Sequence, residues 1–183
     1  MMHKLYPTLG CCGLDCGMCP AYYTDGPSKC PGCAGEDFFE KHPSCSFITC
    51  CVKKRGLEVC AQCEYYPCVK FEGGSDGPDV KTTSKKVLQN QQFIRDFGFD
   101  QFMEQQEQRM VILRKMLDHY NDGRSKTFYC LAATLLSVDS LNKTLTETVQ
   151  RIEAEGVTEE DLKSRAKILK GILNWLADSE GVV

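Results

Sequence analysis

The chain has 183 residues, 22 of them Lys or Arg and 25 of them Asp or Glu, with a formal net charge of −3. This length allows one domain or two small ones. The charge argues against a nucleic-acid partner, because nucleic-acid-binding proteins usually carry a basic patch. No apolar run reaches the roughly 20 residues that cross a membrane, and the first residues lack the pattern of a signal peptide. We therefore expect a cytoplasmic protein with reduced thiols.

Twelve of the thirteen cysteines lie between residues 11 and 68. This part is rich in Gly and Pro and has too little apolar surface for a core of its own, so it needs metals or disulfides as staples. Several cysteine pairs two residues apart, in a short stretch, are a strong pattern for metal binding. The predicted ligands are Cys12, Cys16, Cys19, Cys30, Cys33, His42, Cys45, Cys50, Cys60, Cys63 and Cys68.

Eleven ligands exceed two four-ligand zinc sites and fall one short of three. Either a third site recruits Cys11 or Cys51, or some thiols stay free. We favour the second alternative, in which Cys11 and Cys51 are only neighbours of ligands. His42 is equally compatible with a ligand and with a surface histidine. We expect two or three zinc ions, and an iron–sulfur cluster is the alternative, because clusters also use thiolate ligands.

The sequence contains no Gly-rich phosphate loop, GxSxG or HExxH motif, so we assign no catalytic residue and favour a non-enzymatic role without deciding the question. A thiol enzyme or metal-transfer protein that uses under-coordinated cysteines is a further hypothesis. A disulfide framework would need an oxidising compartment and would leave one thiol over.

Residues 73–79 (GGSDGPD) have the composition of a linker, so the predicted domains are residues 1–72 and 80–183. Beyond them the apolar residues recur at helical spacing. We predict a short helix over residues 87–97, a long one over 99–120 and a buried one around Cys130. Another follows over 141–152, closed by Gly156, and the last, capped by Thr158, carries Leu162 to Leu176. The expected fold is mainly α, with an irregular, metal-stapled Cys-rich module packed on a C-terminal helical bundle.

Five segments carry a resemblance to a known family: CGLDCGMCPAY (12–22), CPGC (30–33), CSFITC (45–50), GLEVCAQCEYYPC (56–68) and DGRSKTFYC (122–130). Together they resemble the family called Domain of Unknown Function 3795, and KSRAKILKGILNWLA (163–177) is similar to its closing helix. Members often have a cysteine at the position of His42, which favours His42 as a ligand, and often lack one at Cys51. The resemblance implies a soluble prokaryotic protein that binds metal, and it implies no activity.

These observations predict a zinc-binding protein that serves as a binding or assembly module, with a protein as its partner and neither nucleic acid nor membrane. The alternative is an iron–sulfur protein of an anaerobe that transfers electrons or senses redox state.

Overall fold

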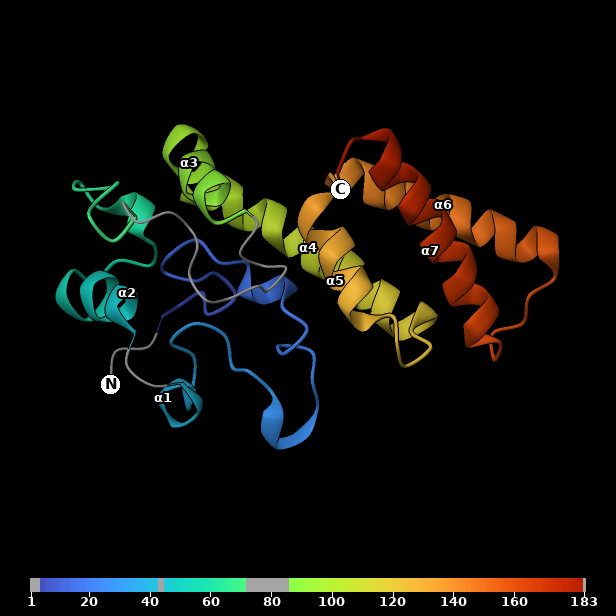
Figure 1. Ribbon diagram of the computed structural model, residues 1–183, viewed down its shortest axis with the longest axis horizontal. Coiled ribbons are helices and arrows are strands. Elements are labelled where there is room, and N and C mark those ends of the chain that lie inside the picture. Colours follow the sequence, from blue (N-terminus) through green and yellow to red (C-terminus); the bar gives the residue numbers. More distant parts are fainter. Residues whose placement is uncertain (1–3, 43–44, 72–85, 183) are drawn as a thin grey trace. The chain divides into compact units, whose positions relative to one another are not determined.

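The computed structural model describes residues 4–42, 45–71 and 86–182 (Figure 1). Within these residues the chain forms seven α-helices and no β-strand, which confirms the predicted mainly helical fold. It divides into two compact units, the N-terminal unit (Met1–Gln106) and the C-terminal unit (Glu107–Val183). The predicted linker lies outside the described residues, so the predicted domains, residues 1–72 and 80–183, stay a prediction.

The N-terminal unit is built mostly from loops and short helical turns. Its regular elements before residue 72 are α1 (Phe38–Lys41), α2 (Ser46–Ile48), a π-helical turn (Thr49–Lys54) and three 3₁₀ turns (Cys16–Met18, Gly26–Ser28, Cys60–Gln62). The first long helix is α3 (Val87–Phe97), and the first turns of α4 (Phe99–Tyr120) complete the unit. Both helices begin and end where the apolar periodicity predicts.

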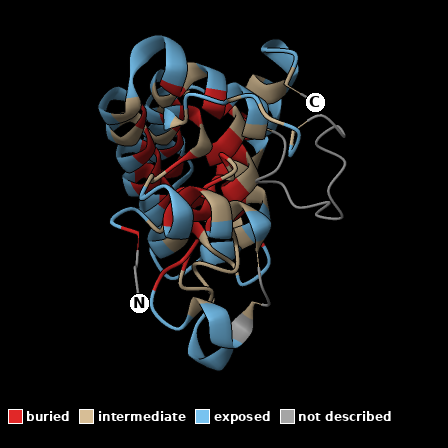
Figure 2. Ribbon diagram, turned by 90° about the vertical axis from the view of Figure 1, so that its left-hand side faces the viewer, coloured by how far each residue is buried: buried red, intermediate tan, exposed pale blue. Residues whose placement is uncertain are grey.

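Two small apolar clusters form the core of this unit. One gathers around Ile48, Val52 and four cysteines, and the other joins Leu9 and Val59 to side chains of α3 and α4. Figure 2 colours the buried residues of the chain red and the exposed ones pale blue. The loops of the unit are therefore anchored to helices that come much later in the sequence.

The C-terminal unit contains the rest of α4 together with α5 (Lys126–Leu135), α6 (Val138–Glu155) and α7 (Leu162–Ser179). The helices α6 and α7 lie side by side (Figure 1). Cys130 is fully buried within α5, as its apolar surroundings predict. No helix of the described residues is long and apolar enough to cross a membrane.

Buried polar side chains complete the helix ends of the C-terminal unit. The hydroxyl of Tyr129 donates to the carbonyl of Tyr120 at 2.8 Å, at the end of α4. The guanidinium of Arg109 donates to the carbonyls of Ala133 (2.6 Å) and Leu136 at the end of α5. Terminal helix carbonyls have no partner within the helix, so these bonds satisfy groups that would otherwise be buried unpaired.

The N-cap of α7 differs from the sequence prediction. The capping residue is Asp161 and not Thr158. The Asp161 carboxylate accepts a hydrogen bond from the amide of Ser164 at 3.0 Å. Both residue types are good N-caps. Residues 158–161 instead form turns, so the helix starts one turn later than predicted.

Asp122 stabilises the turn before α5, and we expect Asp122→Asn to destabilise the C-terminal unit. Its carboxylate accepts from the Ser125 hydroxyl (2.6 Å) and the Arg124 amide (3.0 Å), and these bonds lower its pKa to about 2. Because the pKa of Asp122 is lower in the folded protein, its carboxylate stabilises the fold at pH values above the ordinary pKa of 3.8. This stabilisation disappears as the pH falls towards 2. The expected loss near neutral pH is on the order of 1 kcal/mol.

Thermal unfolding of both proteins, followed by circular dichroism, measures this effect. The difference in melting temperature between wild type and Asp122→Asn should be present near neutral pH and shrink as pH falls below 3.8. An equal difference across the whole range would contradict the assigned role of the carboxylate charge.

Candidate metal centre

A cavity of about 690 Å³ lies within the N-terminal unit, and its wall carries most of the predicted ligands. It brings together thiols that are spread over 34 residue positions of the chain. Its lining contains six cysteines and one histidine: Cys12, Cys16, Cys19, Cys30, Cys33, Cys45 and His42. Seven of the eleven predicted ligands therefore face a single space.

Tight turns present these thiols. Cys16 and Cys19 flank one 3₁₀ turn, in which the Cys19 amide donates to the Cys16 carbonyl at 3.1 Å. The Cys30 amide donates to the carbonyl of Ala21 at 2.9 Å, which holds the second cysteine pair beside the first. Turns of this kind are the usual way in which a CxxC pair points both sulfur atoms at one place.

The second pair is also tied to the start of the chain. The Cys33 amide donates to the carbonyl of Pro7 at 2.7 Å. Gly32 precedes it with φ +84°, and a Cβ at this position would lie 2.4 Å from the Pro7 oxygen. A side chain does not fit here, so glycine permits the close approach that places Cys33 on the cavity wall.

One end of the cavity has mixed ligand types. The Nε2 atom of His42 lies 3.7 Å from the Sγ atom of Cys30. The His42 ring stacks on Phe38 with centroids 4.5 Å apart and an interplanar angle of 21°. This contact orients the imidazole towards the cysteine, and the two together present a nitrogen and a sulfur ligand to the cavity.

Without metal, the inner thiols hold their protons. Burial raises the pKa of Cys12 to about 11 and that of Cys16 well above its ordinary value, with nearby Cys33 adding to the effect on Cys16. The pKa of Cys33 is raised chiefly by its side-chain hydrogen bond with Cys11, and then by burial. Thiolates are the metal-binding form, so metal binding at this cavity would release protons.

The sulfur and imidazole donors are of the type that binds zinc, but the side chains lie too far apart to bind one ion together. Among the described residues, no three His, Cys, Asp or Glu side chains converge closely enough to hold one ion. Zinc–sulfur bonds are about 2.3 Å long. The side chains would therefore have to rotate towards one another for a closed site to form.

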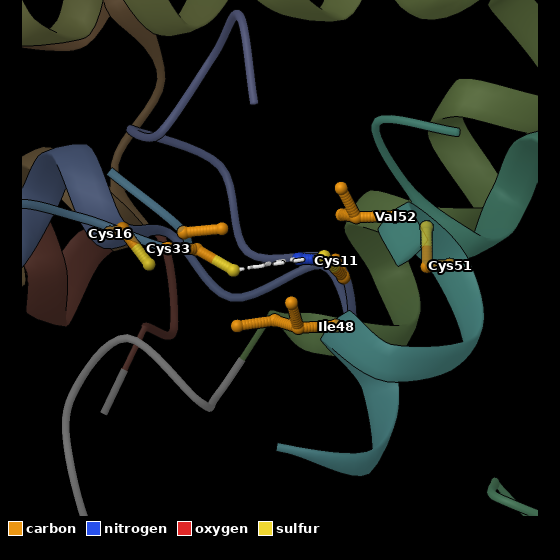
Figure 3. Close-up of a cluster of buried hydrophobic side chains, with 7 residues drawn as sticks. Cys11, Cys16, Cys33, Ile48, Cys51 and Val52 are labelled. Carbon is orange, nitrogen blue, oxygen red and sulfur yellow. Dashed lines mark hydrogen bonds between the residues drawn. The ribbon is translucent and has the colours of Figure 1, made fainter. Parts of the chain in front are cut away.

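Cys11 and Cys51 do not line the cavity, and they pack behind its wall in a cluster that includes Cys16 and Cys33. They are 1 % and 2 % exposed and lie in the apolar cluster with Ile48 and Val52 (Figure 3). The Cys11 amide donates to the Cys33 sulfur at 3.4 Å, and the Cys51 thiol donates to the carbonyl of Leu57 at 3.3 Å. Their interpretation as neighbours of ligands remains a prediction.

The other four predicted ligands, Cys50, Cys60, Cys63 and Cys68, are not among the described residues that line the cavity. All four are partly exposed. The structure thus divides the predicted ligands into a group of seven at the cavity and a group of four elsewhere in the N-terminal unit.

Buried amide side chains support the loop that carries Cys12. Asn90 donates to the Gly13 carbonyl at 2.9 Å, and Gln91 donates to the Cys11 carbonyl at 3.1 Å, both from α3. Gln106 of α4 donates to the buried carboxylate of Asp15 at 2.9 Å. Sequence reasoning missed these residues. The one available signal was Gln106, a polar residue in the otherwise apolar stripe of its helix.

Lys4 is a further buried polar residue that the sequence did not single out. It is 6 % exposed, and its ammonium donates to the carbonyls of Leu9 (2.5 Å) and Glu58 (2.6 Å). It joins the start of the chain to the segment before Cys60. A buried cation in the unit that holds the thiols would also offset negative charge if they ionised.

These features define a helical protein with a cysteine-lined cavity in a loop-rich N-terminal unit. Residues 8–73 match the family described as Protein of unknown function (DUF3795), which confirms the resemblance that the cysteine motifs predict. The match contains every predicted ligand and every residue that lines the cavity. The C-terminal segments that resemble the family lie outside it. No curated protein and no solved structure matches the chain.

Proposed function

We propose that this protein binds zinc through the cysteine-lined cavity. The supporting observation is the gathering of six thiols and one imidazole around a single space of about 690 Å³. Soft thiolate and imidazole ligands are those that zinc prefers, and a structural site takes four of them. Seven donors supply one closed four-ligand site and leave three donors over, one short of a second closed site.

Bound zinc would stabilise a unit whose own apolar core is small. Structural zinc contributes about 10–16 kcal/mol of apparent binding free energy in small domains. The N-terminal unit would then be an irregular, metal-stapled module joined to a helical bundle. We place its role in binding or assembly with a protein partner, in the cytoplasm, where thiols remain reduced.

Elemental analysis of protein purified without added metal tests the proposal. We expect bound zinc in the wild type and a loss of zinc in a Cys16→Ser/Cys30→Ser double variant, because both substitutions remove sulfur ligands from the cavity wall. Cys130→Ser is the matched control, since its thiol is buried in α5 of the other unit. It should leave the metal content unchanged.

Two results would overturn the proposal: a wild-type protein without metal, or a double variant with the same metal content as the wild type. A His42→Ala variant refines the ligand set. It should lower the zinc affinity if the imidazole is a ligand, and leave it unchanged if His42 only packs on Phe38.

An iron–sulfur cluster is the second candidate for the same cavity. Two features of the cavity favour a cluster: its volume, and its six thiols, which are more than one zinc ion needs. A cluster is larger than a single ion and also takes cysteine ligands. Anaerobically purified protein would then be brown, with visible charge-transfer absorption, and would contain iron and acid-labile sulfide. A colourless, iron-free protein would exclude this candidate.

A further inference from the structure

Three of the cysteines outside the cavity, Cys60, Cys63 and Cys68, lie in a series of linked turns. The Cys63 amide donates to the carbonyl of Cys60 at 2.9 Å, and the Tyr66 amide donates to the carbonyl of Cys63 at 3.1 Å. The Phe71 amide donates to the carbonyl of Cys68 at 2.8 Å. These hydrogen bonds keep three thiols within one compact segment, residues 60–71, here called the knuckle segment.

Cys50 comes from a different element, the π-helical turn Thr49–Lys54, and the residue after this turn contacts the knuckle segment. Arg55 follows the turn directly. Its Nη1 atom lies 4.0 Å from the Glu64 carboxylate, and its guanidinium lies 4.8 Å from the ring centroid of Tyr65. Glu64 and Tyr65 come immediately after Cys63, so these contacts place Arg55 beside the residues that follow this cysteine.

A second contact holds the start of the helical segment to the other end of the knuckle segment. Phe47 lies in α2, three residues before Cys50, and its ring packs against Phe71 with centroids 5.2 Å apart. Phe71 also contacts Tyr66 at 5.0 Å. The segment that carries Cys50 therefore contacts the knuckle segment both before and after Cys50 in the sequence.

The charges around the four thiols suit a metal held by thiolates. Arg55 lies beside Glu64 and Tyr65, the two residues that follow Cys63. Arg95 of α3 reaches the carbonyls of Ala61, Cys63 and Tyr66, each at 3.4 Å. A zinc ion with four thiolates carries a net charge of −2, and two guanidinium groups beside it would offset that charge.

We propose that Cys50, Cys60, Cys63 and Cys68 form a second zinc site, closed by four thiolates and separate from the cavity. This second site deepens the proposed function. It rests on that function only for the choice of zinc as the metal. It divides the eleven predicted ligands into a group of four, which satisfies one tetrahedral ion, and the group of seven at the cavity. As at the cavity, the thiols would rotate to close the site.

Two variants of the full chain separate the sites. Zinc per chain is measured in Cys63→Ser and in Cys16→Ser/Cys30→Ser after purification under reducing conditions. We expect Cys63→Ser to lose one zinc ion and keep the metal of the cavity. We expect the double variant to lose the cavity metal and keep one zinc ion. If the two variants lose the same metal, or if Cys63→Ser loses none, the second site is wrong.

X-ray absorption at the zinc edge provides a measurement that needs no folded Cys63 variant. In Cys16→Ser/Cys30→Ser the remaining zinc should have four sulfur neighbours at about 2.3 Å and no nitrogen neighbour. A first shell that includes nitrogen or oxygen would overturn the four-thiolate assignment. The wild type could also hold zinc at this site and none in the cavity. That result would refute the proposed function and would support the second site.

Discussion

Removal of metal by a strong chelator under reducing conditions is expected to unfold the loops of residues 4–71 and to leave α5, α6 and α7 folded. The N-terminal loops have two small apolar clusters and few regular elements, whereas the three helices bury their own core. Structural zinc contributes about 10–16 kcal/mol of apparent binding free energy, more than a small loop-rich core supplies. Hydrogen exchange resolved by peptide measures the effect, as lost amide protection in residues 4–71.

Re-addition of zinc is the control, and it should restore the lost protection. The amide protection of α5, α6 and α7 reports the C-terminal unit in the same experiment and should change little. Unchanged protection of residues 4–71 after complete metal removal would contradict a structural role for metal. Simultaneous loss of protection in α5 to α7 would show that both units unfold as one.

Substitution of Gly13 is expected to have the second largest effect. Gly13 has φ +94°, and an added Cβ would lie 2.6 Å from the Val87 carbonyl oxygen and 2.9 Å from the Gln91 side chain. Gly13→Ala would push the loop of Cys12 away from α3 and break the hydrogen bonds from Asn90 and Gln91. We expect a loss of about 3 kcal/mol or more, from left-handed strain and broken buried hydrogen bonds together.

Gly56→Ala is the matched control, because Gly56 also has positive φ (+65°) but a Cβ there would meet no atom within 4 Å. It should cost only the backbone strain, about 1 kcal/mol. Chemical denaturation of the metal-loaded proteins compares the two variants. Equal destabilisation would show that the contact between the Cys12 loop and α3 adds nothing to the stability of the protein.

The long helices could be predicted from the sequence because their signal is local. The apolar residues of α3 and α4 recur at helical spacing, and both helices end where that spacing ends. The cap of α7 was harder, because Thr158 and Asp161 have similar intrinsic capping preference and the path of the preceding turn decides between them.

The chemistry of the candidate site could be predicted in part. Cysteine spacing identifies potential ligands, since a CxxC pair is fixed by one turn. The division into seven and four depends on contacts between distant residues, such as the hydrogen bond from Cys33 to Pro7 and the ion pair of Arg55 with Glu64. Spacing along the chain carries no information about such contacts, which is why the sequence left the grouping open.

The buried amides of α3 and α4 also determine when the cysteine loops can reach their final form during synthesis. Gln91 bonds a carbonyl 80 positions earlier in the chain, and Gln106 bonds Asp15 across 91 positions. At about 5–20 residues per second, the ribosome exposes the first cysteines several seconds before these helices emerge. The nascent thiols are therefore open to metal, or to oxidation, before the amides that position them exist.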